Sequence, residues 1–217
     1  MLIQTNHITG AILAGGLSRR MGGGDKGLIE LAGRPMIAHV IERLTPQCSR
    51  LVLNANGEPE RFATLGLPVA ADTVGGFVGP LAGVLAGMRW SVAFAPKSTH
   101  ILTASADAPL VPRDLALRLA EGLAGKPDAC IALAASGGHL HPVIGLWPVA
   151  LADDLEAALG EGLRKVLAWT DRHGTVAVEF AFLEAAGERV DPFFNANTPE
   201  ELAEARRLVT LADGGSL

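Results

Sequence analysis

A stretch near the start of the chain combines flexible backbone with positive charge. Residues 12–27 read ILAGGLSRRMGGGDKG and place Arg19, Arg20 and Lys26 among glycines. Glycines let backbone N–H groups approach a ligand closely, and the cationic side chains can pair with anionic oxygens. Such a loop suits a triphosphate, whose charges are costly in a partly dry cleft unless they are paired. The alternative is a solvated surface loop with ordinary basic residues.

Two well-known phosphate-binding patterns do not explain this stretch. Gly22, Gly24 and Gly27 fit G-x-G-x-x-G, but a dinucleotide-binding loop must directly follow a strand and open a helix. Here about eight residues separate Leu13, at the end of an apolar run, from Gly22. A Walker A loop is excluded as well, because Gly27 follows Lys26 where Ser or Thr should bind magnesium.

Short apolar runs alternate with segments of helical period along the chain. This alternation predicts an α/β fold in three α/β/α layers, with a mostly parallel twisted sheet. Strands are predicted at residues 8–13, 50–54, 67–72, 100–106, 129–135, 141–148 and 175–180. Helices are predicted at residues 35–44, 79–90, 112–123, 151–159, 163–169 and 199–208, the last with a capping box of Thr198 and Glu201. Without any linker or repeat, residues 1–217 are expected to form a single domain.

Polar residues stand where three of the predicted strands end. Asn54 ends the second strand, Asp72 ends the third and Asp107 follows the fourth, while the glycine-rich stretch follows the first. Parallel strands put their carboxyl ends at one edge of the sheet, where ligands of open α/β folds bind. We therefore expect these features to converge on one cleft. The structural alternatives are turn residues at Asn54 and Asp72 and a helix N-cap at Asp107.

The composition and net charge of the chain indicate which classes of binding partner to expect. The chain of 217 residues is 49% hydrophobic and has a net charge of −5. A nucleic-acid-binding protein normally carries a strong positive excess, so nucleic acid is not an expected partner. No apolar run reaches the length of about 18 residues that a membrane span needs, so no membrane association is expected. These features indicate a cytoplasmic protein.

Metal-binding patterns are weak in this sequence. Cys48 and Cys130 lie far apart without the spacing of metal ligands, and we interpret them as reduced, mostly buried thiols. His139 and His141 alternate on a predicted strand, a spacing that can bind metal. They lack a third ligand, so a structural role is favoured.

The stretch LAGGLSRRMGGGDKG, residues 13–27, resembles the signature of the molybdenum cofactor guanylyltransferases, whose pattern is roughly L-A-G-G-x-x-x-R-M-G-x-x-K. This family has the nucleotide-diphospho-sugar transferase-like fold, which is Rossmann-like. The resemblance continues in the family's order through LNAN (53–56), DTVGGFVGPLAGVLAGM (72–88), SADAPLVP (105–112), HPVIGLWP (141–148) and FFNANTPEELAEA (193–205). It covers nearly the whole chain.

The resemblance implies how a nucleotide is held. A guanine nucleotide would lie against the residues that end the first strand and begin the loop, namely Leu13, Ala14, Gly15 and Gly16. Its base or ribose would contact Asn54 and Asp72. The double glycine favours GTP over CTP, because related cytidylyltransferases usually have LAAG at this place.

The resemblance also implies the catalytic residues. Lys26 would bind the phosphates of GTP, with Arg19 and Arg20 adding positive charge beside it. Asp107 would contact the nucleotide and bind Mg²⁺, the implied cofactor. Lys26, Asp107 and Arg20 are therefore the predicted catalytic residues. Alanines flank Asp107 here, where the family often has Cys on one side and Thr or Ser on the other.

Four residues are predicted to bind the acceptor, molybdopterin. Arg164 and Lys165 lie in GEGLRKV, which resembles a family stretch that commonly reads Gly-Glu-Arg-Arg, and they would bind the pterin phosphate. Asn195 and Asn197 would contact the pterin side or support the metal. Their alternative is a turn leading into the last helix.

The implied reaction transfers GMP from GTP to the terminal phosphate of Mo-molybdopterin and releases diphosphate. The attacking phosphate monoester has a second pKa of about 6 and is mostly anionic at neutral pH, so no general base is required. In agreement, the sequence motifs contain no Ser-His-Asp arrangement and no carboxylate pair for acid–base work. Catalysis is expected to come from positioning and charge neutralisation.

The implied partners are GTP, molybdopterin or Mo-molybdopterin, molybdopterin-delivering proteins and apo-molybdoenzymes. One alternative is a nucleotidyltransferase of the same fold that uses CTP with molybdopterin, or a sugar phosphate as acceptor. The other is a non-enzymatic GTP-binding regulator or an adaptor for cofactor delivery. The presence of both Lys26 and Asp107 favours an enzyme.

Overall fold

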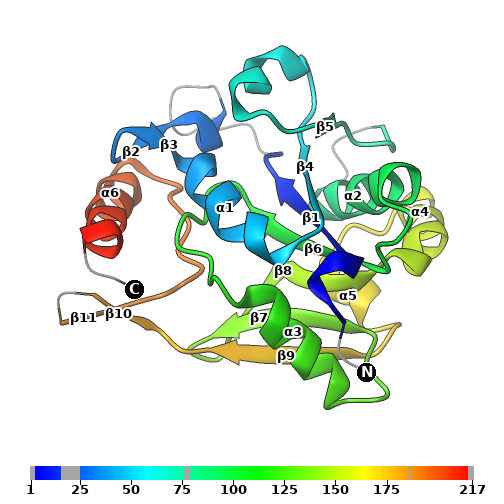
Figure 1. Cartoon of the computed structure of the whole chain (residues 1–217). Coiled ribbons are helices and arrows are strands. Elements are labelled where there is room, and N and C mark those ends of the chain that lie inside the picture. Colours follow the sequence, from blue (N-terminus) through cyan, green and yellow to red (C-terminus); the bar gives the residue numbers. More distant parts are fainter. Residues whose placement is uncertain (1–2, 16–24, 76–78, 186, 215–217) are drawn as a thin grey trace.

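The central sheet carries the strands that the sequence predicts. The computed structural model describes residues 3–15, 25–75, 79–185 and 187–214. Figure 1 shows one large sheet, whose seven strands have the order β5 (Val69–Ala70), β4 (Arg50–Asn54), β1 (Ile8–Leu13), β6 (His100–Ser105), β8 (His139–Pro148), β7 (Ile131–Ser136) and β9 (Thr175–Phe180). All predicted strands are therefore present, although β5 has only two residues.

Most neighbouring strands of the sheet are parallel. β1 pairs in parallel with β4 and β6, and β7 pairs in parallel with β9. β8 is antiparallel to both of its neighbours, β6 and β7. All six residues of β1 are buried, as is typical of a strand covered by helices on both faces. The expectation of a mostly parallel sheet is confirmed.

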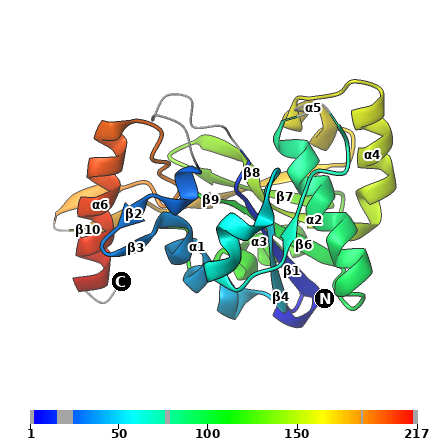
Figure 2. The same ribbon diagram turned by 90° about the horizontal axis from the view of Figure 1, so that it is seen from above.

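Helices cover both faces of this sheet. α1 (Met36–Leu44) and α3 (Leu115–Ala124) pack on one face. The other face is covered by α2 (Pro80–Phe94), α4 (Ala152–Gly160) and α5 (Val166–Thr170). Figure 2 shows these three helices gathered on the same side of the strands. The predicted three-layer α/β/α arrangement is confirmed.

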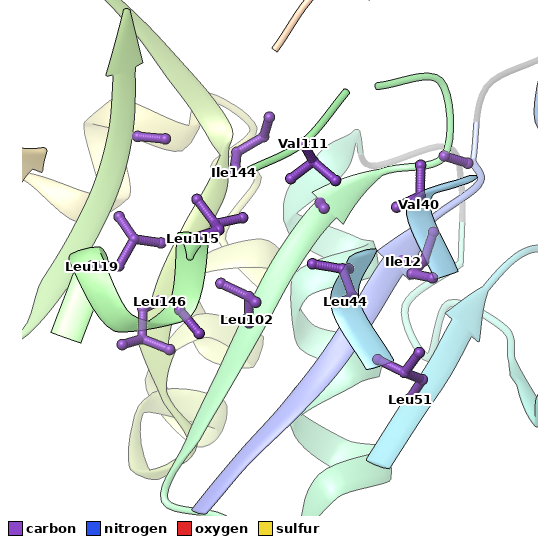
Figure 3. Close-up of a cluster of buried hydrophobic side chains, with 14 of the residues drawn as sticks. Ile12, Val40, Leu44, Leu51, Leu102, Val111, Leu115, Leu119, Ile144 and Leu146 are labelled. Carbon is purple, nitrogen blue, oxygen red and sulfur yellow. The ribbon is translucent and has the colours of Figure 1, made fainter. Parts of the chain in front are cut away.

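Aliphatic side chains fill the space between the first helical layer and the sheet. Val40 and Leu44 of α1 and Leu115 of α3 lie over Ile12 and Leu102 of the strands (Figure 3). All five residues are fully buried, and burial of each such side chain contributes about 1.5–3 kcal/mol. The apolar repeat of α1 therefore fixes the helix on the sheet, and with it the strand ends that form the candidate site.

Two hairpins and α6 (Pro199–Gly214) lie beside the main sheet. The hairpins are β2 (Glu30–Leu31) with β3 (Arg34–Pro35) and β10 (Leu183–Ala185) with β11 (Glu188–Val190). Apolar residues of α6 share a buried cluster with Leu31 of β2 and Val190 of β11. The sequence analysis does not predict these hairpins, because strands this short show no apolar alternation.

The start of α6 is capped as the sequence predicts. The backbone N–H of Glu201 donates to Thr198 Oγ1 at 3.2 Å, and the backbone N–H of Thr198 donates to Glu201 Oε2 at 3.0 Å. The backbone N–H of Asn197 donates to the same carboxylate at 2.7 Å. The cap thus fixes the segment that carries Asn197.

Some helical bounds differ from the prediction. α3 begins at Leu115 rather than residue 112, and α5 begins at Val166 rather than residue 163. Gly162, with a φ of 90°, separates α4 from α5, because this backbone conformation is incompatible with a continuing helix. Pro35 precedes α1 instead of being its first residue. Short 3-10 turns complete the described elements: η1 (Thr5–His7), η3 (Lys26–Leu28), η4 (Thr45–Gln47), η5 (Pro59–Leu65) and η6 (Val149–Leu151).

Two further predictions from the sequence concern the state of the two cysteines and membrane association. Cys48 and Cys130 are both free and partly buried, and burial raises the pKa of the Cys48 thiol to about 12. Cys130 Sγ donates to the backbone oxygen of His173 at 2.7 Å. Among the helices of the described residues, none combines the length and the apolar character that a membrane crossing requires.

A glycine sets the approach of α2 to the sheet. A Cβ atom at Gly87 would lie 2.8 Å from Cβ of Ala11 in β1 and 3.3 Å from Cδ1 of Ile101 in β6. Because the Ala11 Cβ is attached to the strand backbone, it cannot turn aside as the end of a long side chain can. Any larger residue at this position must push α2 away from β1.

We therefore predict that Gly87→Ala lowers the free energy of unfolding by about 1–3 kcal/mol, the usual cost of overpacking. Urea unfolding monitored by circular dichroism measures the change. The matched control is Gly160→Ala at the end of α4, where no atom lies within 4 Å of the added Cβ. Equal stability of the two variants would contradict the close contact between α2 and β1.

Candidate active site

The carboxyl ends of β4, β1 and β6 lie side by side. In the sheet register Leu13 is opposite Asn54 on one side and Ser105 on the other. The pairing continues beyond the strands, since the Ala14 N–H donates to the Asn54 backbone oxygen at 2.9 Å and the Ala106 N–H donates to the Leu13 oxygen at 3.0 Å. The expected convergence of these strand ends is confirmed.

The loop after β1 is described only at its two ends. Ala14 and Gly15 continue from β1, and Asp25 and Lys26 lead into η3. Gly15 is exposed at the edge of the sheet, within reach of a ligand. The predicted residues Gly16, Arg19 and Arg20 lie outside the described residues.

Asn54 and Asp72 form one hydrogen-bonded group at this edge. The Asn54 amide Nδ2 donates to Asp72 Oδ1 at 3.0 Å and to the Ala70 backbone oxygen at 3.1 Å. Asn56 holds the same carboxylate, because its Nδ2 donates to Asp72 Oδ2 at 2.7 Å and its Oδ1 accepts from the Asp72 N–H at 2.9 Å. Asn54 is only 4% exposed, so it positions Asp72, while the partly exposed Asp72 is the group that a ligand can reach.

The start of α2 packs tightly on Asn54. A Cβ atom at Gly83 would collide with Asn54 Oδ1 and would lie 3.0 Å from Leu13 Cδ2. Gly83 therefore leaves the space that the Asn54 side chain occupies. This close approach explains why small residues predominate in the sequence of α2 near the site.

Lys26 and Asp107 form an ion pair across the edge. Lys26 Nζ lies 3.2 Å from Asp107 Oδ2, and the two side chains are 20% and 16% exposed. Lys26 Nζ also donates to Asn197 Oδ1, and Ser105 Oγ donates to Asp107 Oδ1. Charge-assisted hydrogen bonds of this kind are short and strong. The structure thus joins the two described residues that are predicted to be catalytic.

The predicted acceptor-side residues divide into two groups. Asn195 and Asn197 belong to the segment beside Asp107, whose backbone oxygen accepts from the Ala196 N–H at 3.4 Å. The Asn195 Oδ1 atom is buried and lacks a hydrogen-bond partner among the described residues. By contrast, the guanidinium of Arg164 donates to two backbone oxygens, that of Leu159 in α4 at 2.8 Å and that of Leu163 after α4 at 2.7 Å. Lys165 is exposed just before α5.

The structure brings together a serine, a histidine and an aspartate that the sequence motifs do not connect. Ser136 Oγ donates to Asp191 Oδ1 at 2.8 Å and lies 2.7 Å from His141 Nε2. The nearest approach of His141 Nε2 to the Asp191 carboxylate is 3.8 Å. Ser136 and His141 lie five residues apart on either side of the β7–β8 turn, whereas Asp191 is 55 residues from Ser136. The order of contacts differs from a catalytic triad, because the serine proton is directed to the carboxylate rather than to the imidazole.

This cluster has a structural role. Asp191 Oδ1 also accepts from the Phe193 N–H at 2.8 Å, and the Phe193 ring lies 4.7 Å from the His141 ring. Burial lowers the pKa of His141, an effect that the Asp191 carboxylate opposes. The cluster therefore anchors the segment that leads to Asn195 and Asn197. Within the described residues, no group of three or more His, Cys, Asp or Glu side chains could hold a metal ion.

Sequence reasoning did not single out Ser105 as a support of Asp107, or Asn56 as a partner of Asp72. Their spacing gives a usable signal for both. Ser105 lies two residues before Asp107, and Asn56 lies two residues after Asn54 at the end of its strand. The partnership of Lys26 with Asn197 joins residues 171 positions apart. No pattern in a single sequence reports such a contact.

Residues 10–176 match the family model described as the MobA-like NTP transferase domain. The chain belongs to this family. It is 52% identical to the molybdenum cofactor guanylyltransferase of Bradyrhizobium sp. (strain ORS 278) over 210 residues, which cover 96% of each chain. It is 54% identical to the molybdenum cofactor guanylyltransferase of Rhodopseudomonas palustris (strain BisB5) over 198 residues, or 91% of each chain.

A solved structure supports the same fold. The crystal structure of molybdopterin-guanine dinucleotide biosynthesis protein A from Archaeoglobus fulgidus has a TM-score of 0.69 at 24% identity, and the match covers 93% of this chain and 98% of that one. Membership of the MobA-like NTP transferase family confirms the resemblance that the sequence motifs indicate. It also confirms the predicted fold and the class of enzyme, a nucleotidyltransferase.

The geometry at the edge predicts different roles for Asn54 and Asp72. Asn54→Ala should lower the free energy of unfolding by about 1–3 kcal/mol, because it leaves buried polar groups without a donor. Asp72→Ala should lower the free energy of unfolding by less, because Asn54 keeps its hydrogen bond to the Ala70 backbone oxygen. Urea unfolding of both variants gives the comparison. A larger stability loss for Asp72→Ala would show that Asn54 is not the structural member of the pair.

Proposed function

We propose that this chain transfers GMP from GTP to the terminal phosphate of Mo-molybdopterin, forming Mo-molybdopterin guanine dinucleotide and diphosphate. The observation that carries the proposal is the Lys26–Asp107 ion pair at the carboxyl ends of parallel strands, in a chain whose relatives are named molybdenum cofactor guanylyltransferases. A cation and a carboxylate at one place suit a substrate that brings both phosphate oxygens and a metal ion.

The nucleoside half of GTP is assigned to the edge formed by β1 and β4. Exposed backbone at Gly15 allows close approach, as the glycine requires no room for a side chain. The Asp72 carboxylate is held in place by Asn54 and Asn56 and can accept hydrogen bonds from the N–H groups of guanine or the hydroxyls of ribose. Leu13 and Ala14 complete this half.

The phosphate half is assigned to Lys26 and Asp107. Magnesium prefers oxygen ligands and is often bound by one or two carboxylates together with substrate phosphates. Asp107, with the amide oxygens of the neighbouring asparagine segment, offers such a donor set, so the residues present fit Mg²⁺. When bound, Mg²⁺ would neutralise phosphate charge and orient the triphosphate. We propose Asp107 as its protein ligand.

The ion pair also suggests what Lys26 does in the reaction. Without substrate, the ammonium group is neutralised by Asp107 and held by Asn197. With the triphosphate in place, Lys26 can turn to the phosphate oxygens and stabilise the charge that develops on the leaving diphosphate. Asn197 Oδ1 would remain available as a hydrogen-bond acceptor for the ammonium group. Arg19 and Arg20 are proposed to add positive charge.

The acceptor phosphate needs positioning rather than activation. A phosphate monoester with a second pKa of about 6 is already a nucleophile at neutral pH, so the Ser136–His141–Asp191 cluster has no proton to remove from it. Asn195 and Asn197 are proposed to orient the acceptor, and the support is that their segment contacts Asp107 and Lys26. Arg164 and Lys165 are proposed to bind its phosphate from the side of α5.

The proposal extends to the cellular setting. We infer that the enzyme works in the cytoplasm, receives molybdopterin from delivering proteins and passes its product to apo-molybdoenzymes. The support is the chemistry of the reaction, since a reactive cofactor with an exposed phosphate is best transferred directly between proteins.

A nucleotide-preference assay tests the function. The protein is incubated with Mo-molybdopterin, magnesium and each of the four ribonucleoside triphosphates in turn, and diphosphate release and product mass are measured. We expect diphosphate and a guanine dinucleotide product with GTP. Turnover with CTP alone would identify a cytidylyltransferase, and tight GTP binding without any diphosphate release would identify a regulator.

The two central residues give a second prediction. Lys26→Ala and Asp107→Ala should fold normally and lower kcat by about a hundredfold or more, the usual loss when a group that stabilises transition-state charge is removed. Diphosphate release under saturating GTP measures the effect. The matched controls are the exposed residues Lys126 and Asp114, whose alanine variants should retain activity. Near-normal turnover of Asp107→Ala would refute its assignment as the metal ligand.

A further inference from the structure

An arginine that the proposed reaction does not use lies between the two halves of the site. Arg61 belongs to η5, which follows β4, and its Nε is 2.6 Å from Asp25 Oδ2. The same guanidinium donates from Nη1 to the Glu58 backbone oxygen at 2.8 Å and from Nη2 to the Asn56 backbone oxygen. All three nitrogens of the guanidinium are thus engaged, and they join two separate segments of the chain.

The carboxylate partner of Arg61 directly precedes Lys26. Asp25 stands at the position before η3 where a side chain often caps the turn, yet it makes no such capping bond. Its carboxylate is directed to Arg61 instead, and the backbone oxygen of Asp25 accepts from the Leu28 N–H at 3.0 Å. Arg61 therefore fixes the end of the glycine-rich loop, one residue from the ammonium group that pairs with Asp107.

The other partner of Arg61 leads to Asp72. Asn56, whose backbone oxygen accepts from Arg61, makes two reciprocal side-chain bonds with Asp72, of 2.7 and 2.9 Å. Arg61 thus contacts both halves of the proposed nucleotide site. It reaches the phosphate half through Asp25 and the nucleoside half through Asn56.

The local structure makes room for this arrangement and anchors it. Gly57, with a φ of 85°, turns the chain between Asn56 and Glu58, and a Cβ there would lie 2.9 Å from Arg61 Nη1. The guanidinium carbon of Arg61 also lies 4.7 Å from the centre of the Phe62 ring, which is 1% exposed and part of the main core. Arg61 is therefore held against the body of the protein rather than extended into solvent.

We propose that Arg61 is a positioning residue for the nucleotide, which holds Lys26 and Asp72 at the separation that one nucleoside triphosphate requires. The proposal rests on the proposed function in that it places the nucleotide at this edge. Arg61 touches neither substrate nor reacting atoms; it acts through Asp25 and Asn56. A residue that is already held in place has less freedom to lose when a ligand binds, so fixing Asp25 next to Lys26 lowers the entropic cost of nucleotide binding.

The exposed fractions of the Arg61 and Asp25 side chains distinguish a positioning role for Arg61 from a purely structural one. The side chains of Arg61 and Asp25 are 31% and 22% exposed, and an ion pair this close to solvent contributes little to global stability. Loss of the pair should therefore weaken nucleotide binding while leaving the thermal midpoint nearly unchanged. A structural role would move the midpoint instead.

A double-mutant cycle on the full chain tests the proposal. Arg61→Gln, Asp25→Asn and the double variant are compared by calorimetric Kd for GTP with magnesium, by KM and kcat, and by Tm. We expect each single variant to raise Kd and KM about tenfold and the double variant to be no worse than either, because both substitutions remove one shared interaction. We expect kcat at saturating GTP to stay within about twofold of the wild type.

Two further variants sharpen the outcome. Arg61→Lys keeps the charge for Asp25 but not the planar fork that also reaches Asn56 and Glu58, so it should recover only part of the affinity. The matched control is Arg207→Gln, which removes an exposed arginine of α6 that pairs with Glu188 of β11 and with Glu204, and it should leave Kd unchanged.

Several results would overturn the proposal. Unchanged Kd in Arg61→Gln, additive losses in the double variant, or a fall in Tm without a rise in Kd would each exclude the positioning role. Failure of the proposed function gives a different result: the wild type would bind another nucleotide in place of GTP. The same cycle run with that nucleotide would still decide whether Arg61 positions it.

Discussion

Parallel pairing of β1 with β4 and β6 is the constraint on which the site depends. It places the backbone of Leu13 between Asn54 and Ser105, so the polar residues around these strand ends must meet at one edge. The buried helices on both faces fix the strands, and the glycines of α2 allow the helix to approach β1 and Asn54 closely. The geometry of the sheet therefore determines which polar groups lie together at this edge, independently of any ligand.

Two kinds of polar residue share this edge. Asn54 and Ser105 belong to the strands and hold other side chains in place, since they donate to Asp72 and Asp107, respectively. Asp72, Asp107 and Lys26 lie further out and remain partly exposed. The strand residues position the carboxylates, and the residues beyond the strands supply charge. This division explains how segments outside the strands can carry groups that need accurate positions.

Much of this arrangement follows from the sequence, for identifiable reasons. The central strands β1, β4 and β6 are largely buried and read as apolar runs, and the places of Asp107 and Asn54 follow from where those runs end. The capping box at Thr198 is a local pattern and is correct. What the sequence cannot reveal are contacts between residues far apart in the chain, such as Lys26 with Asn197 or Ser136 with Asp191. Those contacts depend on packing of α6 and its hairpins, whose strands are too short to show a period.

The reversed direction of β8 has a consequence for how this enzyme class can diversify. Because β8 is antiparallel, the turn between β7 and β8, at Gly137 and Gly138, lies at the same edge as the ends of β1 and β6. A turn between adjacent strands tolerates changes in length without disturbing the strands themselves. The part of the edge beyond β6 can therefore accept insertions while the β4–β1–β6 part stays constant. One inverted strand thus separates the half of the edge that carries the candidate site from a half where the turn between strands can change in length.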